Sequence, residues 1–408
     1  MRAKAASRKL ALIDTNTKNK ALRGMAAALL ENKAVILKAN MKDLKSAGSK
    51  GMPSAFMDRL TLSGAGIEAM ARSLVEIAGM KDPVGELIDT IKRPNGLVIK
   101  KVRVPIGSIL IIYESRPNVT GDCIGLCLKS GNSVILRGGK EAINSNIAIF
   151  DLLSAEAKRR GIPDGALSIV RDTDRSVVDD LLKAAGLIDL VIPRGGESLI
   201  NEVTEKSRIP VIKHYKGVCH TYVDASADPD MAEKICFNAK VQRPGVCNAM
   251  ETLLVSEDIA KAFLPRMIER FRASGVEIRG CPRTRRIASR GVVKADERDW
   301  YTEYLDMILS VKVVKGVDEA IAHIMKYGSY HSDAIITENK KNALKFLGEV
   351  DSACVYVNAS TRFTDGGEFG KGAEMGISTD KIHARGPMGL DELTSYKYVV
   401  YGNGQVRR

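Results

Sequence analysis

The fold follows from one stretch of sequence, residues 108–139, which reads SILIIYESRPNVTGDCIGLCLKSGNSVILRGG. Its first apolar run, Ile109 to Tyr113, is short and rich in isoleucine, as buried strands are, and Ser133 to Leu136 has the same character. Between them, Thr120 to Lys129 predicts a helix that ends at Gly131. The stretch therefore predicts a strand, a helix and a second strand.

The same alternation continues along the chain. Asn144 to Arg160 predicts the next helix, and further strands are expected at Leu167 to Val170 and at Ile188 to Ile192. A second series of strands and helices runs from about Thr221 to Asn358. Repeated units of this kind predict an α/β protein with doubly wound parallel sheets, whose ligands bind at the carboxyl ends of the strands.

Two segments flank the first sheet. Residues Asn19 to Ala39 carry apolar side chains at helical spacing and predict one amphipathic helix. Residues Glu86 to Val104 predict a projecting hairpin around the turn Pro94-Asn95-Gly96. The aromatic strand Tyr396 to Tyr401 is expected to pair with this hairpin, either within one chain or between subunits.

Composition narrows the class of protein. With 45% hydrophobic and 27% charged residues in 408, the chain is typical of a globular enzyme of more than one domain, and the apolar run near Tyr113 is too short to span a membrane. The first residues lack the pattern of an export signal, and seven scattered cysteines form no disulfide framework, so we expect a cytoplasmic protein. The net charge of +13 is dispersed, and the basic run Arg279 to Arg290 lacks interleaved aromatics. We therefore expect no nucleic acid partner.

Cys247 is the first candidate for chemistry. It follows Pro244-Gly245 on a turn between a helix predicted from Pro229 to about Lys240 and a strand beginning near Thr252. A thiol at such a corner is placed to attack an electrophilic carbon while backbone N–H groups face the resulting oxyanion. The alternative is a small buried core residue.

Two loops after predicted strands combine glycine with positive charge. They are Arg137-Gly138-Gly139-Lys140 and Pro193-Arg194-Gly195-Gly196. Glycine lets the backbone approach a phosphate, and the following helix offers free N–H groups. Neither loop is a complete dinucleotide motif, so an ordinary turn is the alternative at each.

The link Tyr113 to Thr120 carries two further candidates. Asn118 is placed either to cap the following helix or to donate its amide to an oxyanion. Arg116 beside it is a candidate anion clamp.

Four segments resemble those of gamma-glutamyl phosphate reductases, a family of the aldehyde dehydrogenase superfamily. They are Tyr113 to Asn118 (YESRPN), Ser130 to Gly139 (SGNSVILRGG), Gln242 to Ala249 (QRPGVCNA) and His383 to Leu390 (HARGPMGL). They occur in the right order along nearly the whole chain. The resemblance implies an aldehyde dehydrogenase-like fold and NADPH-dependent reduction of L-glutamate 5-phosphate to glutamate 5-semialdehyde and phosphate, the second step of proline biosynthesis.

The resemblance also implies roles for residues. Cys247 would form a thioester, and Asn118 with the backbone N–H of Cys247 would form the oxyanion hole. Arg137, together with Lys140, would face the ribose and 2′-phosphate of NADP(H). Glu303 would hold the nicotinamide ribose, and the alternative for Glu303 is an exposed charge before a strand.

One segment departs from the related hydrolytic enzymes. Those enzymes have a Glu-Leu-Gly-Gly segment whose glutamate activates water, whereas the matching residues His214 to His220 contain no carboxylate. We therefore expect the thioester to exchange with phosphate rather than with water. The candidates for binding substrate or phosphate are Ser115, Arg116, Lys216, Asn358 and Lys371.

Cys219 is a rival thiol within the same segment. Because adjacent residues on a strand point to opposite faces, His220 is badly placed to deprotonate Cys219, and Cys247 is favoured. No metal site is expected, because none of the histidines fits a zinc pattern. They are His214, His220, His323, His331 and His383.

With the resemblance, the expected organisation is a cofactor-binding domain at 1–220, a catalytic domain at 221–365, and a return segment with an oligomerisation strand at 366–408. The projecting hairpin and the last strand favour a dimer or tetramer, and the resemblance implies functional coupling to glutamate 5-kinase. Two alternatives remain: a phosphate-independent semialdehyde dehydrogenase, and a nucleic-acid-binding or structural protein on the same fold.

Overall fold

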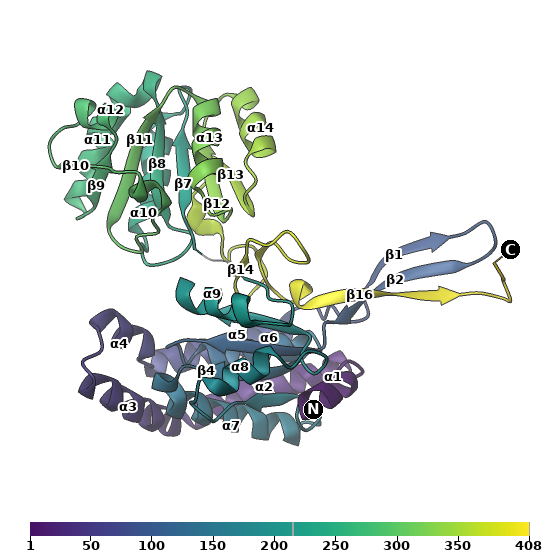
Figure 1. The fold of residues 1–408 in the computed structure, drawn as a ribbon. Helices are drawn as coiled ribbons and strands as arrows, with labels where there is room; N and C mark the ends of the chain where they lie inside the picture. Colours follow the sequence, from purple (N-terminus) through teal and green to yellow (C-terminus); the bar gives the residue numbers. More distant parts are fainter. Residues whose placement is uncertain (214–215, 408) are drawn as a thin grey trace. The chain divides into compact units, whose positions relative to one another are not determined.

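The computed structural model describes residues 1–213 and 216–407, without the side chains of residues 54 and 55, and the chain forms two compact units. Unit 1 comprises Met1–Lys213, Gly370–Gly376 and Met388–Arg408, and unit 2 comprises His214–Phe369 and Ile377–Pro387. Each unit has its own parallel sheet, visible in Figure 1.

The division differs from the expected one in two places. Unit 2 begins at residue 214 rather than 221, because strand β7 (Cys219–Val223) pairs with β8 (Met250–Ser256) and β12 (Ser332–Ile336) in the sheet of unit 2. The tail from residue 366 is not a separate part either, because its segments are divided between the two units.

Unit 1 contains a four-stranded parallel sheet in the order β5-β4-β3-β6. Its strands are β3 (Ser108–Tyr113), β4 (Ser133–Gly138), β5 (Leu167–Ile169) and β6 (Leu190–Arg194). Both strands of the opening stretch are therefore confirmed, and they are neighbours. They are buried, as their apolar character requires, with every side chain of β3 inside.

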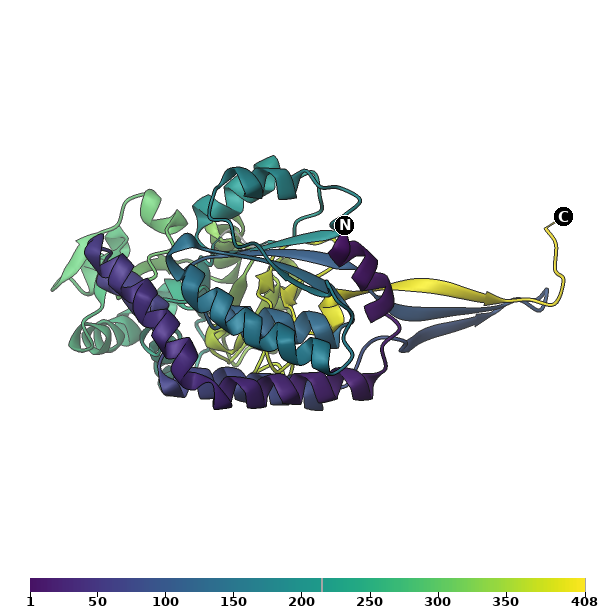
Figure 2. The ribbon, with the colours of Figure 1, turned by 90° about the horizontal axis from the view of Figure 1, so that it is seen from below.

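Helices cover both faces of this sheet, as Figure 2 shows for the layers of unit 1. The side chains of Leu110 and Ile112 pack with Leu182 and Val203 from α8 and α9, whereas α6 contacts β3 and β4 from the other side. The helices of unit 1 are α1 (Arg2–Leu10), α2 (Thr15–Glu31), α3 (Lys33–Ser49), α4 (Ser54–Leu60), α5 (Gly64–Gly79), α6 (Val119–Lys129), α7 (Ile143–Arg159), α8 (Ser176–Leu182) and α9 (Glu197–Lys206), with 3-10 turns η1 (Lys140–Ala142) and η4 (Asp391–Leu393). The doubly wound prediction is confirmed.

The single helix expected from Asn19 to Ala39 is wrong. The chain breaks at Asn32, whose backbone leaves the helical region, and α2 and α3 meet there. The Asn32 side-chain amide donates to the Ala28 carbonyl at 2.8 Å. Asparagine side chains compete in this way for backbone hydrogen-bond partners. The apolar spacing continues from α2 into α3, so the spacing alone does not show that the helix is broken at Asn32.

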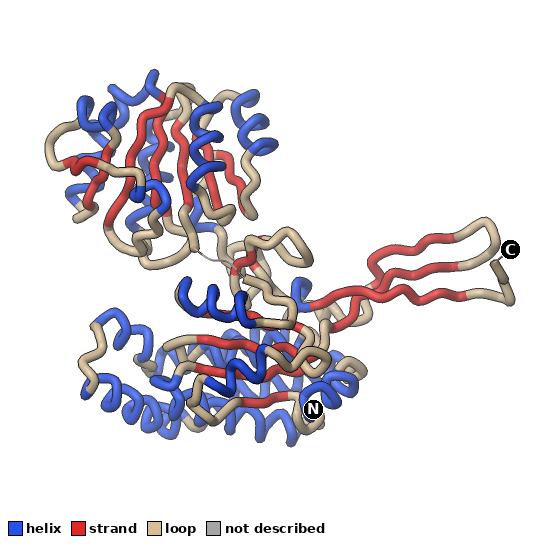
Figure 3. The backbone as a smooth tube through the Cα atoms, viewed as in Figure 1, coloured by secondary structure: helices blue, strands red, loops and turns tan. Residues whose placement is uncertain are grey.

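A three-stranded antiparallel arm extends from unit 1. It consists of β1 (Leu87–Lys92), β2 (Val98–Pro105) and β16 (Thr394–Tyr401), with β2 in the middle, and Figure 3 shows the three strands side by side. The expected pairing of the tail strand with the hairpin is thus confirmed within one chain. Strand β1 is exposed throughout, and exposed side chains on the arm include Tyr398 (57%) and Tyr401 (55%).

Unit 2 is built on a seven-stranded parallel sheet in the order β10-β9-β11-β8-β7-β12-β13. Besides β7, its strands are β8 (Met250–Ser256), β9 (Glu277–Gly280), β10 (Val292–Lys294), β11 (Ile308–Val314), β12 (Ser332–Ile336) and β13 (Cys354–Val357). The short strands β14 (Ile377–Ser378) and β15 (Gly386–Pro387) form a separate antiparallel pair.

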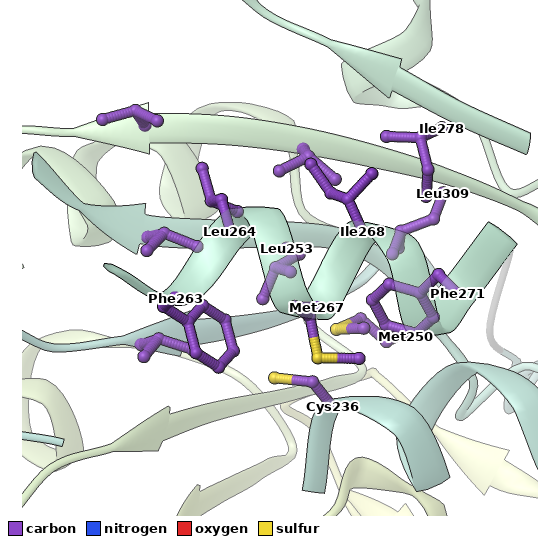
Figure 4. Packing of buried hydrophobic residues seen from close by; sticks show 14 of the residues in the cluster. Cys236, Met250, Leu253, Phe263, Leu264, Met267, Ile268, Phe271, Ile278 and Leu309 are labelled. Carbon is purple, nitrogen blue, oxygen red and sulfur yellow. The ribbon is translucent and has the colours of Figure 1, made fainter. Parts of the chain in front are cut away.

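The two faces of this sheet have separate cores. Leu253 points to a cluster with Phe263, Met267 and Phe271 of α11, which Figure 4 shows from close by. The next residue, Leu254, joins a cluster formed with α13 and α14. The helices are α10 (Pro229–Val241), α11 (Glu257–Ala273), α12 (Pro282–Ile287), α13 (Val317–Tyr327) and α14 (Lys340–Glu349), with turns η2 (Arg298–Tyr301) and η3 (Thr361–Phe363). Within residues 1–213 and 216–407, none of the helices joins the length and apolar character that a bilayer crossing needs.

Candidate active site

Cys247 lies on the turn between the end of α10 and the start of β8, as predicted. The turn is closed by a hydrogen bond from the Ala249 N–H to the Val246 carbonyl, at 3.1 Å. Cys247 is half-buried, whereas the other six cysteines are buried, and none of the seven forms a disulfide. Cys247 is therefore the one partly accessible thiol among the seven cysteines. It lies after the C-terminus of α10, in a turn that belongs to no helix or strand.

Gly217 lies directly against this turn. A Cβ atom at residue 217 would stand 1.8 Å from the Cys247 carbonyl oxygen and 2.7 Å from the Cys247 Cα. The Gly217 N–H donates to Glu303 Oε1 at 2.9 Å. Only glycine allows this approach of two backbones, and its part in the site is one that sequence reasoning missed.

Cys219 supports the turn as a neutral thiol. Its sulfur donates to the Cys247 carbonyl at 3.1 Å. Burial, with the Asp333 charge as a second cause, raises the pKa of Cys219 well above its ordinary value. His220 is turned to Asp333 instead, with Nδ1 at 2.9 Å from Oδ1. This arrangement agrees with the expectation that His220 does not deprotonate Cys219.

Glu303 is half-buried and accepts a hydrogen bond, so it is not the exposed charge of the alternative interpretation. Just after it, the Leu305 N–H, in a left-handed backbone conformation with φ of 52°, donates to Glu251 Oε1 at 3.1 Å. The other oxygen of Glu251 accepts from Lys240 Nζ at 2.6 Å, and both side chains are fully buried. Burial raises the pKa of Glu251 to about 7, against the opposing effect of Lys240. The Lys240–Glu251 pair therefore holds the segment that carries Glu303, whose carboxylate accepts from the Gly217 N–H next to the nucleophile turn.

We expect Glu251→Ala to lower the free energy of unfolding by about 3–5 kcal/mol, because it leaves the Lys240 ammonium buried without its partner. The matched control is the double variant Lys240→Met/Glu251→Gln, which removes the charge and keeps an acceptor for the Leu305 N–H. Urea unfolding of both variants measures the difference. Equal losses in the two variants would contradict a cost that arises from the unpaired ammonium.

Asn118 immediately precedes helix α6 in unit 1. Its side chain makes no capping hydrogen bond, so the capping alternative is wrong, and only its backbone carbonyl serves the helix, accepting from the Gly121 N–H at 3.1 Å. The residue is exposed. Its amide makes no hydrogen bond within the part of the chain that the structure describes, and remains available as a donor.

Ser115 takes a left-handed conformation, with φ of 43°, between β3 and α6. Its hydroxyl donates to Glu141 Oε1 at 2.7 Å, and the residue is buried. A left-handed conformation is strained for serine, and such residues cluster at functional sites. Arg116 next to it is exposed.

The loop after β4 is compact. Arg137 is buried, and its guanidinium donates to the carbonyls of Gly138 (2.7 Å) and Thr173 (3.1 Å), while its Nε has no partner within the described chain. A Cβ atom on Gly138 would stand 2.1 Å from Asn146 Nδ2, so any larger residue there would require the Asn146 side chain to move. Lys140 is exposed at the start of η1.

The loop after β6 binds a carboxylate group of the same chain, the side chain of Glu114. The Gly196 N–H, at the N-terminus of α9, donates to Glu114 Oε2 at 3.0 Å. A Cβ atom on Gly195 would stand 2.5 Å from the same oxygen. The loop therefore has the chemistry expected of an anion site, and the Glu114 carboxylate occupies the position expected for a phosphate. A dinucleotide phosphate could bind at this loop only if the Glu114 carboxylate moved away from the Gly196 N–H.

The remaining candidates are engaged by their own units. Asn358 exchanges two hydrogen bonds of 2.9 Å with the backbone of Thr337, and Lys216 donates to the Tyr301 carbonyl at 3.0 Å. Lys371, in unit 1, pairs with Glu392. His214 and Tyr215, which belong to the segment compared with the hydrolytic enzymes, lie outside the described residues.

Two arginines beside the nucleophile were missed. Arg362 donates to the side chains of Gln242 and Asn248, and Arg243 follows Gln242 in the chain. Arg243 lies in the QRPGVCN motif, so its position near Cys247 was visible in the sequence. Arg362 is distant in sequence, and no local pattern connects it with Cys247.

Comparison with known proteins gives a consistent result. The aldehyde dehydrogenase family model matches residues 1–286. The gamma-glutamyl phosphate reductase of Caldanaerobacter subterraneus subsp. tengcongensis is 60% identical over 407 residues, covering 100% of this chain and 98% of its own, and that of Geobacter metallireducens is 55% identical over 406 residues, covering 100% and 97%. The crystal structure of the Thermotoga maritima gamma-glutamyl phosphate reductase matches with a TM-score of 0.98 and 51% identity, covering 100% and 98%.

Proposed function

The chain belongs to the gamma-glutamyl phosphate reductases, within the aldehyde dehydrogenase family, and on that premise we propose that Cys247 carries the reduction of L-glutamate 5-phosphate to glutamate 5-semialdehyde. This is the second step of proline biosynthesis, and the family implies a nicotinamide cofactor. The observation that carries the assignment of Cys247 is its position: a half-buried thiol on an irregular turn, with the backbone of Gly217 packed against it.

The reaction at Cys247 has two parts. The thiolate sulfur attacks the acyl phosphate carbon, the carbon–oxygen bond to phosphate breaks, and the electron pair leaves with phosphate, which gives a thioester. NADPH, when bound, supplies the hydride that reduces this thioester. Reduction leaves a negative charge on the former carbonyl oxygen of the thioester. This oxyanion returns its electron pair to the carbon, the carbon–sulfur bond breaks, and the aldehyde leaves while the Cys247 thiolate is restored.

Asn118 and the backbone N–H of Cys247 are proposed to hold the oxyanion. The Asn118 amide supports this role, because its N–H₂ group is exposed and donates no hydrogen bond within the described residues. Donors of this kind stabilise developing negative charge in both parts of the reaction.

The loops of unit 1 are proposed to hold NADP(H). Arg137, Gly138, Gly139 and Lys140 would face the adenosine ribose and its 2′-phosphate, with Pro193, Arg194, Gly195 and Gly196 at the second loop. Support comes from the buried Arg137 Nε, which lacks a partner among the described residues, and from the exposed Lys140, whose charge suits a phosphate. Glu303 of unit 2 is proposed to hold the nicotinamide ribose.

The thioester is proposed to exchange with phosphate and not with water. The described residues 216–220 contain no carboxylate, and the nearby carboxyl groups are already engaged, Glu303 with Gly217 and Glu251 with Lys240. Water attack would therefore lack a general base, whereas phosphate is itself a nucleophilic anion.

The test is the reverse reaction with glutamate 5-semialdehyde, NADP⁺ and inorganic phosphate, followed as formation of NADPH. We expect turnover to rise from the background level to saturation as phosphate is added, and sulfate at equal ionic strength serves as the control anion. Turnover that is equal with and without phosphate would favour the alternative, a semialdehyde dehydrogenase that releases the free acid.

We also propose that the protein is a cytoplasmic homo-oligomer, a dimer or tetramer, that works together with glutamate 5-kinase. The exposed apolar and aromatic side chains of the arm support the oligomer, because a three-stranded sheet without a covering layer buries little apolar surface by itself. Seven cysteines without a disulfide support a reducing compartment.

A further inference from the structure

Arg362 spans the turn that carries the nucleophile. Its Nε donates to Gln242 Oε1 at 2.9 Å, and its Nη1 donates to Asn248 Oδ1. Gln242 and Asn248 stand at opposite ends of the turn, and Asn248 is the residue after Cys247. The guanidinium group is therefore fixed within the immediate surroundings of the nucleophile.

The segment that carries Arg362 is tied to the same turn. The Thr361 hydroxyl donates to the Asn248 carbonyl at 2.7 Å, and Asn248 Nδ2 donates to the Thr364 carbonyl at 2.8 Å. Thr361, Thr364 and Asn248 are all buried. Buried hydrogen bonds of this kind set the position of the guanidinium before any ligand arrives, which lowers the cost of ordering it on binding.

Positive charge remains available at this place. Arg243 is exposed, and it makes no hydrogen bond or ion pair within the residues that the structure describes. The Nη2 of Arg362 likewise has no acceptor in that part of the chain. Burial, and then the Arg243 charge, lower the pKa of Arg362, while the charges of Asp365 and Cys247 oppose this effect. Arg362 therefore interacts electrostatically with both Arg243 and Cys247, and the two neighbouring arginine charges favour an anion beside them.

Resting on the function proposed above, we infer that Arg243 and Arg362 form the site that holds the phosphate group of the acyl phosphate beside Cys247. As the sulfur–carbon bond forms and the carbon–oxygen bond breaks, the departing oxygen gains negative charge, and guanidinium groups stabilise it by charge-assisted hydrogen bonds. In the reverse direction the same groups hold inorganic phosphate, whose oxygen attacks the thioester carbon and releases the thiolate.

The substrate carries a second anionic group, its α-carboxylate, which guanidinium groups also bind. The phosphate is favoured because it is bonded to the carbon that Cys247 attacks, whereas the α-carboxylate lies at the far end of the carbon chain. Arg362 donates to residues at both ends of the nucleophile turn, and a guanidinium held there suits a group attached to the carbon that Cys247 attacks.

A protection experiment tests the site without turnover. The full-length protein is alkylated with iodoacetamide, and modification of the peptide that contains Cys247 is followed by mass spectrometry at increasing inorganic phosphate. We expect phosphate to slow this alkylation, and the half-protecting concentration to rise at least ~10-fold in Arg243→Gln and in Arg362→Gln, since each change removes a charged hydrogen-bond donor. The control is Arg266→Gln, which makes the same charge change in the same unit, where Arg266 pairs with Asp230 and Glu233.

The steady-state reverse reaction identifies which anion is bound. We expect Arg243→Gln to raise the KM for phosphate at least ~10-fold and to leave the KM for the semialdehyde within about twofold. A rise confined to the KM for the semialdehyde would assign the site to the α-carboxylate and overturn the inference. So would phosphate protection that is absent in the unaltered protein or equal in Arg243→Gln.

The two experiments distinguish a wrong phosphate site from a variant that does not fold and from a wrong proposed function. Arg243 is exposed and makes no hydrogen bond or ion pair within the described residues, so Arg243→Gln tests the site even if Arg362→Gln fails to fold. If the unaltered protein turns over without phosphate, the proposed function fails, and the protection experiment still reports on the anion site by itself.

Discussion

Cys247→Ala is expected to lower kcat in the reverse reaction by at least ~10⁴-fold, because removal of a covalent nucleophile leaves only binding and oxyanion stabilisation. The free energy of unfolding should change little, since the side chain is half-buried and its turn is held by backbone contacts. The measurement is the initial rate of NADPH formation at saturating semialdehyde, NADP⁺ and phosphate.

Cys219→Ser is the matched control. A serine hydroxyl at residue 219 keeps a donor for the Cys247 carbonyl, so the turn retains its support, and we expect kcat to stay within about tenfold of the original. A loss in Cys219→Ser as large as that in Cys247→Ala, with a normal unfolding transition, would assign the chemistry to the rival thiol.

Gly217→Ala is expected to lower kcat by on the order of 100-fold although residue 217 contributes no side chain to the chemistry. The added Cβ would overlap the Cys247 carbonyl oxygen at 1.8 Å, so the two backbones must separate and the sulfur must move. The same crowding should lower the free energy of unfolding by about 1–3 kcal/mol. Steady-state kinetics and urea unfolding on one preparation measure both effects.

Gly348→Ala is the control for this substitution. Gly348 lies in α14 of the same unit, and a Cβ there meets nothing within 4 Å. Because alanine has a higher helix propensity than glycine and residue 348 lies in the last turn of α14, we expect the free energy of unfolding to rise by at most about 1 kcal/mol and kcat to remain unchanged. If Gly217→Ala behaved like Gly348→Ala, the close approach at the nucleophile turn would have no role in positioning Cys247.

The patterns that predicted the fold are local. Strand β3, helix α6 and strand β4 follow from an apolar run, a helical stretch and a terminating glycine that occur close together, and the turn before Cys247 follows from Pro244-Gly245. Such patterns do not predict side-chain hydrogen bonds that compete with the backbone. Asn32 breaks the expected helix because its side-chain amide donates to the Ala28 carbonyl.

Apart from Arg243, which lies in the motif around Cys247, the parts of the site that were missed come from contacts between distant segments. The need for glycine at residue 217 depends on the backbone of Cys247, and the role of Arg362 depends on Gln242 and Asn248. Likewise, the anion-binding character of Gly195-Gly196 was predictable, whereas its partner Glu114 was not. Spacing predicts what a loop can bind, and tertiary structure decides which group reaches it.

The interrupted path of unit 1 has a consequence for the order in which the protein folds during synthesis. Unit 2 occupies most of residues 214–387 and is complete before the last strand of unit 1 has been made. Strand β16 must then pair with β2, which was synthesised much earlier, and the pairing places Tyr401 opposite Val98 and Thr394 opposite Pro105. Until that pairing forms, one edge of β2 is unprotected and prone to aggregation, so synthesis of β16 decides whether the arm is closed by its own chain.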